Sequence, residues 1–175
     1  MDLHGVEYFY TLSLIAVTFA VVSALVMLLR QSMGGKLSNF DIYLTGAYVR
    51  FGFGLTIAAI LPTLLILFEP TPPLLWGISG LLAAAIVGGS VGSAVRHRRL
   101  ASQVAMSWGV AASFLTHMAV AIFLVALAFV PVLQTAGFYG AAITLSLADV
   151  MWTFVRRITS LLGSSPGSDW DPRRG

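Results

Sequence analysis

The sequence predicts an all-α membrane protein, a bundle of five transmembrane helices over residues 1–162. Three observations support this fold class. Of the 175 residues, 58% are hydrophobic and only 10% are charged, whereas a soluble domain carries about 25% charged residues. Five apolar runs are each long enough to cross a bilayer, and the basic residues gather at one set of run ends. Lipid is the solvent that tolerates such a composition.

The first helix is expected over residues 8–29, an uncharged run of about 22 residues that spans a hydrocarbon core of about 30 Å. A cleaved signal peptide is the alternative. It would carry positive charge before the run and a small-residue cleavage site after it. Here Glu7 precedes the run, and Arg30 and Lys36 follow it. This charge order predicts a retained helix whose N-terminus lies outside the cell.

The second helix is expected over residues 42–68. Asp41 stands where it would cap the helix start. Arg50 interrupts the apolar run and marks its inner end. Pro62 has no N–H group, so the carbonyl of Ala58 loses its usual helical partner and a kink is expected.

The third helix is expected over residues 74–95, after a stiff proline-rich turn at residues 69–73. A basic cluster, Arg96, Arg98 and Arg99, ends this run. Such clusters fix helix ends on the cytoplasmic side and attract anionic lipid headgroups, at about 1 kcal/mol per basic residue. The bilayer is therefore the expected partner of these side chains, and their position at run ends argues against nucleic acid.

The fourth and fifth helices are expected over residues 104–130 and 138–155. Each contains a polar side chain inside its apolar run, His117 in the fourth and Asp149 in the fifth. Residues 163–175 consist mostly of Gly, Ser, Pro and charged residues, which predicts a disordered cytoplasmic tail.

The distribution of charge predicts the topology. With five spans and an outer N-terminus, all ten Lys and Arg residues lie in the cytoplasm or at its interface, and the outer segments hold only the acidic Asp2, Glu7 and Glu69. The positive-inside rule predicts this split. If the fifth run did not cross, the four arginines after it would lie outside. The C-terminus is therefore expected in the cytoplasm.

Small residues recur on the third helix at a spacing of four. One row is Gly80, Ala84, Gly88 and Gly92, and a parallel row beside it is Ala85, Gly89 and Ser93. In lipid, where no hydrophobic force draws helices together, small residues let backbones approach closely. Packing within the chain is one interpretation, and a self-association face or a pore-lining seam is the other.

Asp149 is the most informative residue, because a carboxylate inside a spanning helix costs about 2.5–3.5 kcal/mol on insertion scales. Ser146 shares its helix face, as Ser113 shares that of His117. By rise per residue, His117 and Asp149 both lie near the bilayer centre. Either they line a path for protons, ions or solutes, or they form a buried hydrogen bond between helices. Arg50 either extends to the interface or pairs with Asp149.

The sequence predicts no cofactor, no metal and no catalytic centre. It contains no cysteine, which excludes disulfides, thiolate catalysis and iron–sulfur clusters. The three histidines fall at three different depths, which argues against a bis-histidine haem. No set of histidines and carboxylates is clustered as a metal site requires, and no nucleophile elbow is present. A non-enzymatic protein is therefore expected.

Several helix ends carry a familiar pattern. The segments are Glu7 to Arg30, Ser38 to Tyr43, Leu61-Pro62, Leu75-Trp76 with Ser79-Gly80-Leu81, and Tyr139 to Phe154 with Arg156. Together they resemble a loose group of small bacterial multi-pass membrane proteins of unknown function. The likeness covers most of the chain except the tail. It implies a bacterial inner-membrane location and supplies no activity, substrate or catalytic residue.

Two functions are compatible with these features. The leading expectation is a non-enzymatic bundle that self-associates, or binds another membrane protein, through the small residues of the third helix. The alternative is a small ion, proton or solute transporter or channel that uses Asp149 and His117.

Overall fold

The computed structural model describes residues 3–32, 39–100 and 108–163, and nearly all of them are helical. The elements are α1 (Leu3–Ser32), α2 (Asn39–Ile66), α3 (Pro72–Leu100), α4 (Trp108–Phe129), a short 3-10 turn η1 (Pro131–Leu133) and α5 (Ala136–Gly163). The described residues contain no strand. The predicted all-α fold with five helices is confirmed for this part of the chain.

All five helices are long and apolar enough to cross a membrane. The candidate spans are Gly5–Leu29, Thr45–Ile66, Pro72–Ser93, Ala111–Phe129 and Ala136–Arg156. A bilayer core of about 30 Å requires about 20 helical residues, which each of these segments approaches or exceeds. The fold is therefore that of a small multi-pass membrane protein.

Some helices extend beyond the apolar runs that predicted them. α3 continues through the basic cluster that begins at Arg96, and the helix ends at Leu100. α5 continues past Arg156 and ends at Gly163. Arginine is a good helix former, so its charge ends the span without ending the helix.

The start of α2 also differs from expectation. α2 begins at Asn39, so Asp41 belongs to its first turn and does not cap it. α4 is described from Trp108 onward. The expected helical residues 104–107 and the tail beyond Gly163 lie outside the described residues.

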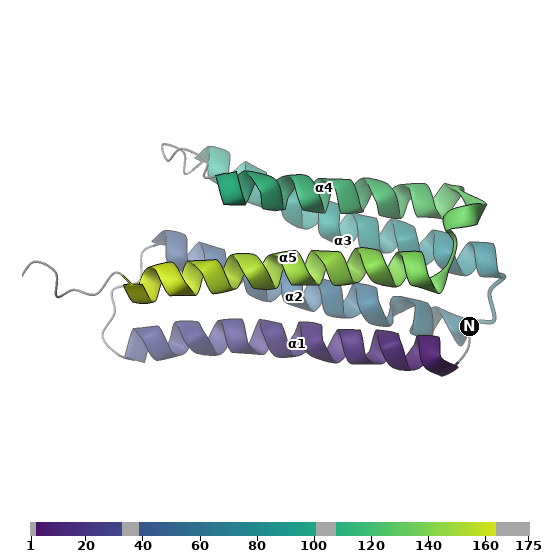
Figure 1. The fold of residues 1–175 in the computed structure, drawn as a ribbon, viewed down its shortest axis with the longest axis horizontal. Helices are drawn as coiled ribbons and strands as arrows, with labels where there is room; N and C mark the ends of the chain where they lie inside the picture. The colour runs from purple at the N-terminus through teal and green to yellow at the C-terminus, as the bar shows by residue number, and fades with distance from the viewer. Residues whose placement is uncertain (1–2, 33–38, 101–107, 164–175) are drawn as a thin grey trace, which may run out of the picture.

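The helices lie along the long axis of the molecule, and consecutive helices run in opposite directions (Figure 1). Each helix packs against the next one in the chain, and α5 makes further, smaller contacts with α2 and α1. The order of helices around the bundle therefore follows the sequence, and α5 closes it.

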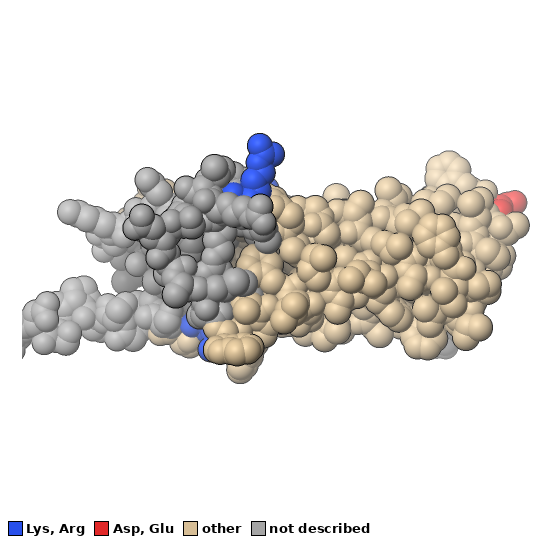
Figure 2. Space-filling model, turned by 90° about the horizontal axis from the view of Figure 1, so that it is seen from above, with Lys and Arg blue, Asp and Glu red and all other residues tan. Residues whose placement is uncertain are grey.

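Charge separates the two ends of the bundle. Glu7 and Glu69 are exposed at what we term the acidic end, where α1 starts and α2 meets α3. Arg96 and Arg156 are exposed at the opposite, basic end. Figure 2 shows acidic side chains at one end and basic ones toward the other. This is the separation that the positive-inside rule requires; which end faces the cytoplasm stays a prediction.

An aromatic cluster fills the core near the acidic end. The ring of Tyr139 lies 5.7 Å from that of Phe9 and 5.9 Å from that of Trp76, so three helices meet here. The Tyr139 hydroxyl also donates a hydrogen bond of 2.5 Å to the carbonyl of Ala58. This is the carbonyl that Pro62 leaves without a helical partner, and α2 continues through that proline. The Tyr139 hydroxyl of α5 therefore supplies the hydrogen bond that the Ala58 carbonyl of α2 lacks within its own helix.

Candidate functional site in the basic half of the bundle

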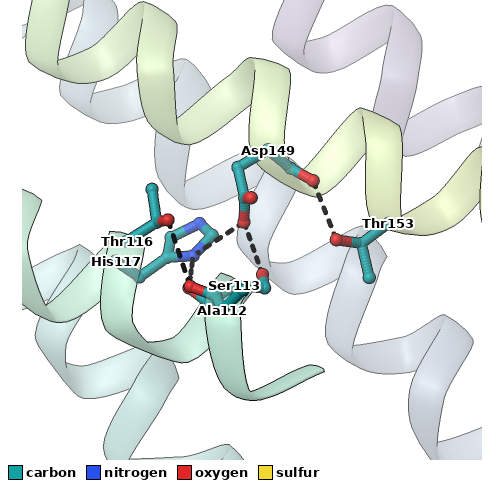
Figure 3. Close-up of polar contacts among 6 residues, drawn as sticks. All are labelled: Ala112, Ser113, Thr116, His117, Asp149 and Thr153. Atoms are coloured by element: carbon teal, nitrogen blue, oxygen red, sulfur yellow. Dashed lines mark hydrogen bonds and ion pairs between the residues drawn. The ribbon is translucent and has the colours of Figure 1, made fainter. Parts of the chain in front are cut away.

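His117 of α4 and Asp149 of α5 meet between their helices (Figure 3). The Nδ1 atom of His117 lies 3.2 Å from Oδ2 of Asp149. His117 is buried, whereas the Asp149 side chain is 20% exposed. Both residues lie within candidate membrane spans. The structure thus brings together the two polar residues that the sequence marked as unusual.

Ser113 completes the contact from one turn earlier on α4. Its hydroxyl donates to Oδ2 of Asp149, and its backbone carbonyl oxygen lies 2.8 Å from Nδ1 of His117. Nδ1 therefore faces two oxygen acceptors, a carbonyl and a carboxylate. An imidazole nitrogen in such surroundings carries a proton, so we assign the Nδ1–H form to His117.

The other ring nitrogen of His117 is isolated. Nε2 is buried with no hydrogen-bond partner, and the ring of Phe51 from α2 packs edge-on at a centroid distance of 4.8 Å. Ser146 shares the face of Asp149, yet its hydroxyl is buried and also has no partner. A buried polar group without a hydrogen bond costs about 1–3 kcal/mol. The described residues therefore provide hydrogen-bond partners for only some of the polar atoms in the cluster.

The two sides of the cluster differ. Toward the basic end, Thr153 donates to the backbone carbonyl of Asp149 at 2.9 Å, and the guanidinium of Arg156 lies over Gly109. Toward the acidic end, α4 and α5 present buried aliphatic side chains, namely Leu124, Leu127, Ile143 and Leu147. Beyond Ser146, aliphatic side chains therefore border the cluster toward the acidic end, whereas polar side chains border it toward the basic end.

The cluster lies nearer the basic end of the bundle than the acidic end. Asp149 is seven residues before Arg156, which corresponds to about 10 Å along the helix. His117 is six residues after Ala111, where the fourth candidate span begins, or about 9 Å. The expected central position of His117 was counted from Val104, and residues 104–107 lie outside the described part of the chain.

The predicted arginines take different positions. Arg50 is exposed on α2, and the ion pair of Asp149 in the described part of the chain is with His117. An exposed arginine within a span extends its charged group toward the interface. Arg96 is exposed at the basic end, while the side chains of Arg98 and Arg99 lie outside the described residues.

The first small-residue row of α3 faces α4 over part of its length. A Cβ atom on Gly80 would lie 2.7 Å from the carbonyl oxygen of Leu124, and one on Gly88 would lie 3.8 Å from the Cβ of Ala121. Ala84 between them is buried, whereas Gly92 is exposed. Close packing within the chain therefore uses the row from Gly80 to Gly88.

Metal binding has little support in this cluster. No group of three or more His, Asp or Glu side chains comes together among the residues that the structure describes. His117 and Asp149 offer two ligands, whereas structural and catalytic zinc sites use three or four protein ligands. The chemistry available here is that of proton exchange between an imidazole and a carboxylate.

Comparisons with protein-family models, with curated proteins and with solved structures found no match to this chain. The fold therefore rests on the five apolar helices themselves. The bacterial inner membrane, implied by the resemblance of the helix ends, stays a proposal.

Proposed function

We propose that this chain is a small proton-translocating membrane protein in which His117 and Asp149 carry the proton. One observation supports this most directly: Nδ1 of His117 and Oδ2 of Asp149 lie 3.2 Å apart within the candidate spans of two helices. Imidazoles and carboxylates are the groups that form intramembrane proton relays.

Charge balance makes the pair a site for one exchangeable proton. With Nδ1 protonated, Nε2 bare and Asp149 ionised, the pair has a net charge of −1. One added proton makes it neutral, either as an imidazolium–carboxylate pair or as a neutral imidazole beside a carboxylic acid. Net charge is unfavourable in a low-dielectric interior. Loading and unloading of this proton therefore changes the electrostatics of the α4–α5 contact.

The surroundings favour a carrier over an open channel. An open channel needs a water-filled route along its whole length, and apolar constrictions close such a route by dewetting. Here polar groups continue toward the basic end, and beyond Ser146 buried aliphatic and aromatic side chains line the bundle toward the acidic end. A site that is open to one side at a time is the arrangement of alternating access. We therefore assign proton entry to the basic end in this conformation.

A purely structural contact is the competing explanation of the pair. It accounts for the bond between α4 and α5, and the buried hydroxyls of Thr63 and Ser79 show that polar groups without a partner also occur away from the pair. Protonation of Asp149 and proton uptake by the whole protein distinguish the two explanations.

Infrared difference spectroscopy tests whether Asp149 exchanges a proton. Protein reconstituted in lipid is compared between acidic and alkaline buffer. A carboxylic acid band should appear in the acidic state and be lost in Asp149→Asn. Ser23→Ala is the matched control, because the Ser23 hydroxyl is buried and bonds to its own helix at Phe19. A spectrum of Asp149→Asn identical to that of the control would show that Asp149 does not titrate and would refute the proposal.

Proton uptake into proteoliposomes tests translocation. Vesicles with an internal pH dye are subjected to a potassium diffusion potential. We expect saturable uptake above that of empty vesicles, lowered at least about tenfold by Asp149→Asn or His117→Phe, because either change removes one half of the pair. Ser23→Ala should retain the uptake. Equal rates in all variants would assign the flux to leakage.

Self-association through α3 is a second candidate, and one observation favours it. Ala85, Gly89, Gly92 and Ser93 are exposed, and a Cβ atom on Gly89 or Gly92 would meet nothing within 4 Å. This face remains available after the row from Gly80 to Gly88 has packed against α4. A second copy or another membrane protein would approach closely there.

Gly89→Leu separates this candidate from packing within the chain. The substitution enters open space, so the monomer should stay folded while any complex dissociates. Gly80→Leu is the matched comparison, because it meets the backbone of α4 and should unfold the monomer. Cross-linking in native membranes measures the amount of complex formed by each variant. Complexes that persist in Gly89→Leu would exclude this face as the contact.

A further inference from the structure

We propose that the basic end of α4 and α5 binds the phosphate of an anionic phospholipid through Arg156. The inference is independent of proton translocation. It rests on the position of the Arg156 guanidinium, on two exposed tryptophans beside it and on the distribution of acidic residues in the chain.

The guanidinium of Arg156 lies against α4 at Gly109, where there is no side chain in its way. A Cβ atom on Gly109 would lie 2.8 Å from Nη1 and 3.4 Å from Cζ of Arg156. Any larger residue would therefore displace the guanidinium, which now lies on the surface of α4 although it belongs to α5.

Two tryptophans place this group at headgroup depth. Trp108 precedes Gly109 and is 88% exposed, and Trp152 is one helical turn before Arg156 and is 64% exposed. Arg156 is the last residue of the fifth candidate span. Tryptophan is enriched where the hydrocarbon meets the headgroups, because its ring is apolar and its indole N–H is polar. Arg156 and the two rings therefore occupy the level of the lipid phosphates.

In the described part of the chain the guanidinium of Arg156 has no carboxylate partner, and the side chains of Asp41, Asp169 and Asp171 lie outside that part. The sequence has no Asp or Glu between Glu69 at the acidic end and Asp149. Asp149 accepts from Ser113 and pairs with His117 about 10 Å further in along α5. A guanidinium binds a phosphate through two parallel hydrogen bonds. An anionic phospholipid supplies that phosphate at the right depth together with a negative surface.

Native mass spectrometry of protein extracted from membranes tests this assignment. The sample receives equal amounts of phosphatidylglycerol and phosphatidylcholine, and the ratio of retained lipids is measured. Removal of one basic contact should lower the preference for phosphatidylglycerol about fivefold in Arg156→Gln. Gly109→Leu, which displaces the guanidinium, should lower it similarly. Gln31→Ala, an exposed uncharged residue at the same end, is the matched control and should retain the preference. Arg96→Gln should lower the preference less than Arg156→Gln, because Arg96 contributes only its charge to the basic end.

Three outcomes would overturn the proposal. The first is an unchanged preference in Arg156→Gln. The second is an equal loss in Arg156→Gln and Arg96→Gln, which would indicate general attraction to the basic end. The third is displacement of the lipid by excess soluble glycerol phosphate, which would identify a site for free phosphate. The readout is lipid retention, so a failure of the proton proposal would leave this result unaffected.

Discussion

At the scale of residues, helical period and rise were sufficient to predict the candidate site. Ser113 and His117 are one turn apart on α4, so their side chains share a face, and that face meets Asp149 in the structure. Ser146 shares the face of Asp149 equally well but makes no hydrogen bond. Shared faces predict which residues are neighbours. They do not predict hydrogen-bond partners, which depend on the crossing of two helices.

The same limit applies to the two contacts that the sequence did not reveal. Pro62 indicated that the carbonyl of Ala58 needs a partner, but nothing pointed to Tyr139, which is 81 residues from Ala58. Gly109 precedes Ser113 by one turn on the same face of α4, and this was a usable signal for close approach. Its contact, Arg156, could not be inferred without the helix arrangement.

Tyr139→Phe should destabilise the bundle by about 1 kcal/mol, because the Ala58 carbonyl then stays buried without a donor while the aromatic packing is retained. The free energy of unfolding in mixed detergent and SDS micelles measures the effect. Tyr10→Phe is the control, since Tyr10 is exposed. Equal stability of the two variants would mean that the hydrogen bond to Ala58 contributes nothing.

At the scale of elements, small residues on two helix pairs explain how closely the helices pack. The sequence drew attention to the glycines of α3. The structure also places Gly52 of α2 against α1, where a Cβ atom would lie 2.9 Å from the Cβ of Ala20 and 3.3 Å from the carbonyl of Ala16. Small-residue spacing thus identifies helices that approach closely. Which partner each one meets depends on packing around the whole bundle.

Gly52→Ala should therefore cost about 1–3 kcal/mol, because the added methyl group forces α1 and α2 apart. Gly46→Ala on the same helix has no atom within 4 Å of the new methyl group. It should be neutral or stabilising by up to about 1 kcal/mol through helix propensity. Thermal denaturation in detergent compares the two. A Gly52→Ala protein as stable as Gly46→Ala would contradict the close α1–α2 contact.

At the scale of the whole molecule, hydropathy predicted the number of helices because lipid selects for apolar length. Hydropathy could not predict the order of the helices in the bundle, because all five helices have apolar surfaces. Their order depends on how the side chains of neighbouring helices pack together. The separation of charge was readable from the sequence, and the structure places Glu7 and Glu69 at the end opposite Arg96 and Arg156.

The absence of cysteine from the sequence allows a test of topology without background. Thr71 and Ser32 are exposed near opposite ends of the bundle, at the α2–α3 connection and the end of α1. With the basic end in the cytoplasm, Thr71→Cys should react with a membrane-impermeant maleimide in intact cells. Ser32→Cys should react only after permeabilisation. The reverse pattern would place the basic end outside.

The bond between Tyr139 and Ala58 also has a consequence for biosynthesis. Translation produces the N-terminal helices first, so α2 is made with its proline gap long before α5 exists. During that interval no phenol from α5 is present to occupy the exposed carbonyl, and a nascent chain truncated before Ala136 would keep the defect. α5, which is synthesised after the other four described helices, thus completes the backbone of α2.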